Sequence, residues 1–362
     1  EQMPYPNAVG MTYDSGEYAK SMNMCMELAD WRGFEARKKE AESRGLLLGR
    51  GFANYVESSI GTPREQAEIH VRADGHIDLV IGTQPSGQGH ETSFAQVAAE
   101  WLGVPVNTIS VIVGDTDLVK VGGGSHSGRS MRMAGTVIVK AADELIEKSK
   151  KLAAVVLEAA ETDLEFHDGK FQVVGTDREI SLYALAEVVG RRSDLPEKLS
   201  VIEDNVMETP VFPNGCHICE IEIDPVSGAY KIARYTTVDD VGRAINPLIV
   251  DGQTHGGIVQ GLGEAMMEDF VFDRKTSQPL SASFMDYCLP RADDVPFFGS
   301  ETHEVLTQLN PLGIKSGGEA GTTPALGCFM NALVDALKPL GIKDVEMPAT
   351  PRRVWEAIQT GH

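Results

Sequence analysis

The order of strand-like and helix-like segments is the feature that most restricts the fold of this chain. Alternating apolar and polar residues predict β-hairpins at residues 65–83, 164–174 and 216–235. Helical spacing follows these hairpins at 93–102, 182–190 and 251–268. Further helices are expected at 17–39, 131–160, 326–340 and from Pro351, which Thr350 is placed to cap, and a buried strand at 108–113. Hairpins that precede helices predict an α+β fold of two-layer α/β sandwich units. The strand–helix–strand alternation of a Rossmann fold is missing.

A polar stretch at 191–203 contains a proline and predicts a boundary between two units, 1–200 and 201–362. The two units share a weak internal similarity. The first hairpin leads into Gly87-Gln88-Gly89-His90, and the third leads into the similar run Gly-Gln-Thr-His-Gly-Gly at 252–257. This similarity favours two related units that face one ligand.

The net charge of −21 argues against nucleic acid and anionic membranes as partners. No apolar run approaches the roughly 20 residues of a membrane helix, so no membrane span is expected. The polar N-terminus shows no secretory signal and the five cysteines are scattered, which favours a cytoplasmic location. Cys216 and Cys219 have the spacing of a metal or redox pair. The alternating residues around them favour an ordinary strand, and no second pair follows.

Three glycine-rich stretches precede expected helices and are the candidate sites: 84–92, 114–130 and 315–324. Backbone N–H groups at such positions bind anions, but glycines also serve ordinary turns, so the first stretch alone is weak. The second combines hydroxyl side chains with Arg129 and suits a pyrophosphate as well as it suits a surface loop. In the third, Glu319 is a candidate base, and the simpler alternative is an acidic residue favoured at a helix start.

Taken in order, these motifs resemble the C-terminal half of the molybdopterin-binding large subunit of the xanthine dehydrogenase/aldehyde oxidase family. That family includes aldehyde oxidases and aerobic carbon monoxide dehydrogenases. The matching motifs lie between about Tyr13 and Ile358, at 87–92, 114–116, 239–247, 251–253, 257, 260–261, 263, 317–319 and 347–351. The resemblance implies the family's molybdenum-cofactor-binding fold.

The resemblance also implies roles for individual residues. The metal is held by the dithiolene of the pterin, so no protein residue is expected as a metal ligand. The motif Gln88, Gly89, His90 and Thr92 matches pterin-contacting positions, and Asp115, Thr116, Ser125, Ser127 and Arg129 match the region of a dinucleotide tail, expected to be cytosine dinucleotide. Asn246, Gln253, Gln260, Lys315 and Gly318 belong to motifs that line the cofactor. Glu319 matches the glutamate beside the metal, which acts as the base on Mo–OH; a carboxylate in a dry site suits that role near neutral pH.

Two departures from the family matter. Gly128 stands where relatives often have a second serine before the arginine, which puts the details of tail binding in question. The family subunit is about twice as long, and its first half, with the substrate-selecting loop, has no match here. The N-terminal half of the molybdenum subunit is therefore expected as a separate chain or a missing segment. No four-cysteine cluster spacing or flavin fingerprint occurs, so 2Fe–2S and FAD groups are expected on partner subunits of a heteromer.

The resulting hypothesis is part of a molybdenum hydroxylase that hydroxylates a small-molecule substrate (an aldehyde, a purine or other N-heterocycle, or a similar compound) with water as the oxygen donor. A non-catalytic molybdopterin carrier or insertion protein is the alternative from another class, although a carrier has no need of Glu319. An α+β binding domain whose glycines only make turns is the third interpretation, and metal analysis separates it from the others.

Overall fold

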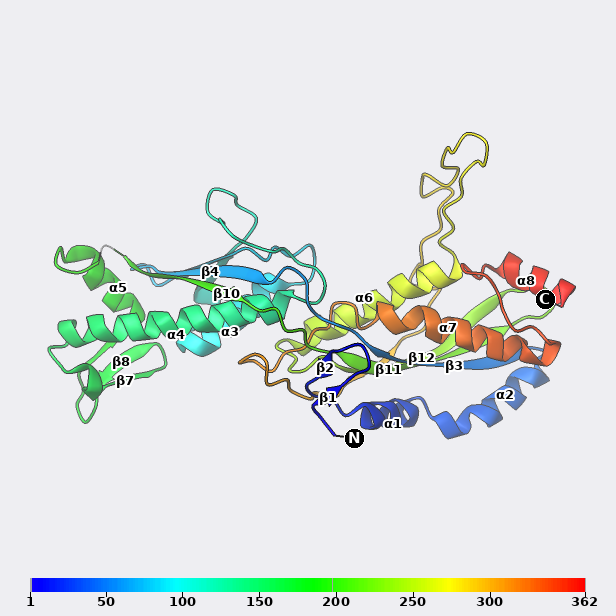
Figure 1. Cartoon of the computed structure of the whole chain (residues 1–362), viewed down its shortest axis with the longest axis horizontal. Helices are drawn as coiled ribbons and strands as arrows, with labels where there is room; N and C mark the ends of the chain where they lie inside the picture. The colour runs from blue at the N-terminus through cyan, green and yellow to red at the C-terminus, as the bar shows by residue number, and fades with distance from the viewer. Residues whose placement is uncertain (1, 197, 362) are drawn as a thin grey trace.

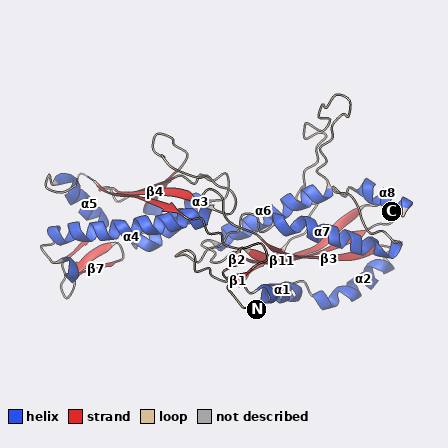
Figure 2. Ribbon diagram, in the orientation of Figure 1, coloured by secondary structure: helices blue, strands red, loops and turns tan. Residues whose placement is uncertain are grey.

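The computed structural model describes residues 2–196 and 198–361. Residues 1 and 197, which belong to the polar N-terminus and to the expected boundary at 191–203, lie outside the described residues, as does residue 362. Figure 1 shows two units side by side, and Figure 2 shows that each combines helices with β-sheet. We call the unit around α3 (His90–Leu102), α4 (Ser130–Val156) and β4 (Arg64–Val71) the first unit. The second unit is the one around α6 (Pro247–Met266), α7 (Thr322–Leu337) and β11 (Asn214–Ile223).

The sheet of the first unit has the strand order β10-β4-β5-β6. Its strands are β4 Arg64–Val71, β5 Ile77–Ile81, β6 Ile109–Ile112 and β10 Leu199–Val206. The β4–β5 pair confirms the hairpin expected at 65–83, and Ala67, Ile69 and Val71 alternate into the core. The helices α3 His90–Leu102 and α4 Ser130–Val156 supply the other layer. Residues of both helices join those strand residues in one apolar core.

A smaller sheet extends the first unit at its outer end. It contains β7 Leu164–His167, β8 Lys170–Val173 and β9 Glu179–Ser181 in that order. The helix α5 Leu182–Arg191 follows, and the Ser181 hydroxyl accepts a hydrogen bond from the Ala184 N–H at its start. The short pair β1 Tyr5–Pro6 and β2 Thr12–Tyr13 lies near the N-terminus.

The sheet of the second unit has the strand order β13-β12-β11-β3. Its strands are β3 Leu47–Val56, β11 Asn214–Ile223, β12 Tyr230–Asp240 and β13 Gly299–Thr302. The helices are α1 Tyr18–Leu28, α2 Phe34–Ser43, α6 Pro247–Met266, α7 Thr322–Leu337 and α8 Pro351–Thr360. In Figure 1, α6 and α7 lie above the sheet and α1 and α2 below it. The Thr350 hydroxyl accepts from the Arg353 N–H, which confirms Thr350 as the cap of α8.

The helix α7 lies directly on the backbone of β3 at two glycines. A Cβ at Gly51 would come 1.9 Å from the carbonyl oxygen of Cys328, and one at Gly49 would come 2.1 Å from that of Ala332. Side chains at these positions would push the helix off the sheet. The two glycines therefore set how closely this layer packs.

Sheet membership does not follow the expected division at residue 200. Strand β3 belongs to the second unit because it pairs antiparallel with β11, with Gly51 opposite Cys219. Strand β10 extends past residue 200 and pairs with β4 of the first unit. Each unit is thus built from segments that are distant in sequence, and local composition does not reveal such pairings.

Two further expectations differ from the structure, and a third is confirmed by it. The helix expected at 17–39 is broken into α1 and α2 because Asp30 adopts a left-handed conformation with φ 48°. Strand β6 is half-exposed rather than buried. The strand interpretation of Cys216 and Cys219 is confirmed: they lie in β11, and Cys216 packs in a core with α1 whereas Cys219 packs in the core with α7.

No helix in the described part of the chain combines the length and the apolar composition that a membrane crossing requires.

Candidate active site between the two units

A cavity of about 290 Å³ lies where both units contribute residues. Gln88 and His90 come from the turn before α3 and from its first residue. Ser127, Gly128, Ser130 and Met131 come from the loop before α4 and from its first turn. The second unit supplies the start of α6 through Asn246 and Ile249, and the loop before α7 through residues 314, 316–319. Both runs of the weak sequence similarity reach this cavity, the first through Gln88 and His90 and the second through Gln253.

The helix starts give this cavity a positive electrostatic character. The N-termini of α3, α4 and α6 line it, and the loop that leads into α7 completes the wall. A helix N-terminus carries unpaired N–H groups and about half a positive charge, so it favours anions. Arg243 adds the one Lys or Arg side chain among the described lining residues. A strongly acidic chain therefore contains a local site that suits an anionic ligand.

Polar groups in the wall are left without partners among the described residues. The His90 Nδ1 and the Ser316 Oγ are both buried and make no hydrogen bond to the residues that the structure describes. Burial lowers the pKa of His90 to about 4, so its imidazole is neutral near pH 7 and can donate or accept one hydrogen bond. The ring stacks on Phe94, with centroids 5.0 Å apart. Buried polar groups are normally hydrogen-bonded, so these two atoms fit a polar ligand seated in the cavity.

Glu319 lies in the cavity wall on the loop before α7, and its side chain is exposed. The dry surroundings expected for this carboxylate are not supplied by the described residues of this chain. The loop is held by the Gln253 side-chain amide, which donates to the carbonyl oxygen of Gly318 at 3.0 Å. Gln253 thus fixes the backbone next to Glu319 to the wall of α6.

A second carboxyl group, that of Glu57, lies next to Glu319. Glu57 directly follows the end of β3. Burial first, and then the neighbouring Glu319 carboxyl, raise the pKa of Glu57 to about 8. Its Oε2 is buried and makes no hydrogen bond that meets ordinary geometry with the described residues. Burial and a neighbouring carboxyl group both disfavour the ionised form of Glu57, so its protonated form is favoured. No sequence motif pointed to Glu57, because only the fold brings the end of β3 to the loop before α7.

Most residues predicted from the sequence gather at the cavity. Those in its wall are Gln88, His90, Ser125, Ser127, Asn246, Gln253, Gly318 and Glu319. Gly89 adjoins it as the left-handed residue before α3, where a Cβ would lie 3.0 Å from the Ile249 side chain. Asn246 also caps α6, since its side-chain oxygen accepts from the Ile249 N–H at 3.1 Å.

Other predicted residues lie outside the wall. Thr92, Asp115, Thr116 and Gln260 are exposed and do not line the cavity. The Asp115 carboxylate accepts from the Asp117 N–H at 2.9 Å and shapes its own loop. The Thr322 hydroxyl lies 3.4 Å from the Gln260 side-chain oxygen, next to the start of α7. The tail-binding role of Asp115 and Thr116 stays a prediction.

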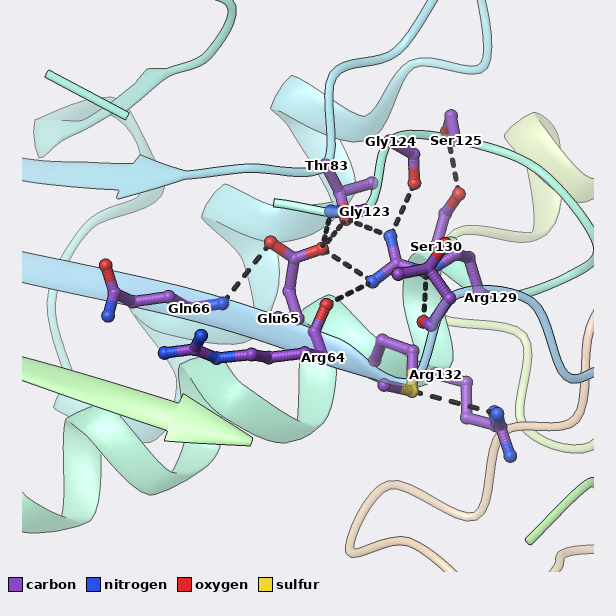
Figure 3. A network of polar contacts seen from close by, with 12 residues as sticks. Arg64, Glu65, Gln66, Thr83, Gly123, Gly124, Ser125, Arg129, Ser130 and Arg132 are labelled. Atoms are coloured by element: carbon purple, nitrogen blue, oxygen red, sulfur yellow. Dashed lines mark hydrogen bonds and ion pairs between the residues drawn. The ribbon is translucent and has the colours of Figure 1, made fainter. Parts of the chain in front are cut away.

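Arg129 is fully buried and binds protein groups rather than facing the cavity (Figure 3). Its guanidinium donates to the Glu65 carboxylate at 2.8 Å and to the Thr83 hydroxyl at 3.1 Å. It also donates to the carbonyl oxygens of Thr62, Arg64 and Gly124. With these donors engaged, Arg129 fixes the glycine-rich loop onto β4. Its place in the region of the dinucleotide tail stays a prediction.

Lys315 likewise has an internal partner. Its ammonium group lies 2.5 Å from Asp240, and both side chains are fully buried. Asp240 also accepts hydrogen bonds from the Asn214 side chain and from the Gly242 N–H. The pair joins the end of β12 to the strand-like segment before Gly317. Lys315 therefore positions the loop that carries Glu319. Its contact with the cofactor stays a prediction.

The chain is similar to known proteins in both sequence and fold. Residues 24–296 match the model of the molybdopterin cofactor-binding domain. The chain is 30% identical over 378 residues to the carbon monoxide dehydrogenase large chain of Hydrogenophaga pseudoflava, covering 99% of this chain and 47% of that one. It is 34% identical to the 6-hydroxypseudooxynicotine dehydrogenase complex subunit gamma of Paenarthrobacter nicotinovorans, covering 96% and 44%. The crystal structure of quinoline 2-oxidoreductase from Pseudomonas putida 86 superposes with a TM-score of 0.89 at 30% identity, covering 99% and 48%.

Fold, cavity and relatives together define a molybdopterin-binding protein. The chain belongs to the molybdopterin cofactor-binding family of molybdenum-enzyme large subunits, which confirms the resemblance found in the sequence motifs. Its α+β architecture is that of these enzymes. The chain spans a little less than half the length of the relatives that it matches.

Among the described residues, no group of three or more His, Cys, Asp or Glu side chains is placed to hold a metal ion directly. The residues present do fit a pterin that carries the metal itself. They offer the orphaned His90 Nδ1 and Ser316 Oγ, hydroxyl groups from the start of α4, and helix N-termini for an anionic part.

Proposed function

We propose that this chain forms the cofactor-binding and proton-accepting part of a molybdenum hydroxylase, with Glu319 as the base. The substrate class is a small molecule such as an aldehyde, a purine or other N-heterocycle, or a similar compound, and water is the oxygen donor. One observation carries the proposal: an exposed carboxylate stands in the same cavity wall as the N-termini of α3, α4 and α6. A carrier needs such helix starts to hold the cofactor but has no use for the carboxylate.

Some residues of the cavity would bind the cofactor, and others would accept or hold protons. When bound, the molybdenum cofactor supplies the redox centre and the site of oxygen transfer. The neutral His90 and the Ser316 hydroxyl would hydrogen-bond its polar edge, and the N–H groups at the start of α4 would hold its anionic part. Glu319 accepts the proton that leaves when water-derived oxygen is activated, at a carboxylate oxygen. Glu57, with its raised pKa, stores a proton beside it.

The finer parts of the proposal extend beyond the cavity. The cofactor would carry a cytosine dinucleotide, whose tail Asp115 and Thr116 would hold. Electrons leave through 2Fe–2S and FAD groups on partner subunits in the cytoplasm. The remaining half of the large subunit completes the active site. Purification of the complete complex, followed by metal analysis and release of the nucleotide, tests these points together. A complex without stoichiometric molybdenum would rule out the enzyme and favour a binding domain of another kind.

Gly128 offers a test of cofactor binding. It has φ +64°, and a Cβ there would come 2.3 Å from the Ser316 Oγ and 2.8 Å from the Ser59 Oγ. Gly128→Ala should therefore displace Ser316 from the cavity wall and lower the molybdenum content per chain about tenfold. Gly124→Ala is the matched control, because Gly124 has φ +73° and no atom within 4 Å of an added Cβ. Equal molybdenum content in the two variants would show that Ser316 does not hold the cofactor.

Glu57 predicts a specific dependence of stability on pH. Its pKa in the folded chain is about 8, above the ordinary 4.5, so the folded state holds this proton more tightly than the unfolded state. The contribution of this proton to the free energy of unfolding is therefore fully present below about pH 4.5 and is lost as the pH rises through 8. Glu57→Gln removes this loss. We expect it to stabilise the chain relative to wild type by at least about 2 kcal/mol at pH 8.5 and by little at pH 4.5, in denaturant unfolding.

The control for this experiment is Glu208→Gln, which neutralises an exposed glutamate elsewhere in the fold. Its stability difference from wild type should not change between the two pH values. If the stability difference between Glu57→Gln and wild type were the same at both pH values, Glu57 would be ionised at neutral pH.

A further inference from the structure

A long excursion of the chain, residues 267–298, connects the end of α6 to the start of β13. We call it the arm. In Figure 1 the arm rises from the second unit, away from the sheet and its covering helices. Nothing in the cofactor site uses it, since its residues do not line the cavity. Its base is at the C-terminal end of the 20-residue helix α6, about 30 Å from the cavity end of that helix.

The arm is ordered by hydrogen bonds between its two limbs. The N–H of Leu280 donates to the carbonyl oxygen of Val271 at 2.7 Å, and that of Asp273 to Gln278 at 2.9 Å. The Ser281 hydroxyl accepts from the Val271 N–H at 2.8 Å and donates to the carbonyl oxygen of Asp269 at 3.0 Å. The backbone of residues 269–281 is thus arranged before any partner binds, which lowers the entropy cost of docking.

Large apolar side chains of this ordered arm face solvent. Phe284 is 81% exposed, Met285 92% and Phe297 92%. Phe270, Phe272 and Leu280 are each about half exposed. Burying a side chain of this size gains roughly 1.5–3 kcal/mol, and exposed apolar patches of this kind mark interaction surfaces.

Chain length and charge indicate which polypeptide covers the exposed apolar side chains of the arm. Relatives that match 99% of this chain contain as much polypeptide again, because this chain covers only 47–48% of them. A second copy is disfavoured because each copy carries a net charge of −21, and two such surfaces repel. We propose that the arm docks into an apolar groove of the polypeptide that corresponds to the remaining half of the relatives' large chain. This inference rests on the proposed function for the existence of that half in the complex.

The test places a photo-crosslinking amino acid at Phe284 in the complete complex, purified from cells that produce it. Mass spectrometry then identifies the crosslinked peptide. We expect it to come from sequence outside residues 1–362 that aligns with the remaining half of the relatives' large chain. The same probe at Val174, 55% exposed on the turn after β8 in the first unit, serves as the control and should give at least tenfold less of that product.

A second variant tests the same contact with the crosslinking probe at another residue of the arm. Met285→Ser should lower the yield from a probe at Phe297 about tenfold, whereas Val174→Ser should leave it unchanged. Crosslinks to residues 1–362 of another copy, to an iron–sulfur or flavin chain, or to no protein at all would each overturn the inference. If the expected crosslink forms in a complex without molybdenum, the docking surface stands and the proposed function fails. If molybdenum is present and the crosslink is absent, the proposed function stands and the docking surface fails.

Discussion

Glu319→Gln is expected to lower the turnover of the complete enzyme about 10³-fold while the molybdenum content stays that of wild type. The amide keeps the shape of the side chain but cannot accept a proton, and loss of a general base typically costs a factor of 10²–10⁴. The cofactor should stay bound, because the polar groups that fit it are His90, Ser316 and the helix starts. Steady-state turnover normalised to molybdenum per chain measures the effect.

The matched control is Glu264→Gln. Glu264 is exposed on α6, near the helix end that lies away from the cavity, and its substitution should leave turnover unchanged. Full turnover by Glu319→Gln with the cofactor retained would contradict base catalysis by this residue. A wild-type complex that binds the cofactor but turns over no substrate of the proposed classes would favour the carrier alternative.

Arg129→Met is expected to destabilise the chain by about 3–5 kcal/mol, the largest stability effect that the structure predicts. Arg129 and Glu65 are both fully buried and paired at 2.8 Å. Methionine fills most of the space but leaves the Glu65 carboxylate buried without its cation, and an unpaired buried charge has a cost of this size. Denaturant unfolding of the chain measures the change.

The double variant Glu65→Gln/Arg129→Met separates the charge from the packing. Removing both charges should recover at least half of the lost stability, because no unpaired ion then remains in the core. A double variant as unstable as Arg129→Met would show that the hydrogen bonds of Arg129 to the carbonyl oxygens of Thr62, Arg64 and Gly124 matter more than its ion pair.

Several features were accessible from the sequence because their causes are local. Alternation placed the β4–β5 hairpin, since Ala67, Ile69 and Val71 face one core. The Thr350 cap and the turn between β11 and β12 depend on neighbouring residues alone. The family followed from the order of glycine-rich motifs, each of which marks a place where backbone must approach a ligand closely.

The assignment of strands to the two units could not be predicted from local sequence. Strand β3 precedes the first sheet in sequence but pairs with β11, more than a hundred residues later. Pairings at that separation depend on how whole layers pack and on the cost of closing the loops between them, not on local composition. The expected boundary at residue 200 therefore falls inside β10, which belongs to the first sheet.

The sequence by itself determined the α+β class, the family and the motif that contains Glu319. Only the tertiary structure decided what the charged residues do. Their motifs suggested that Arg129 and Lys315 bind the cofactor. In the structure, Arg129 pairs with the buried carboxylate of Glu65, and Lys315 pairs with that of Asp240, each from another segment. The structure also brought Glu57 beside Glu319. A motif shows which groups a chain carries, but the partner of a buried charge is set by the packing of distant segments, because desolvation makes that partner obligatory.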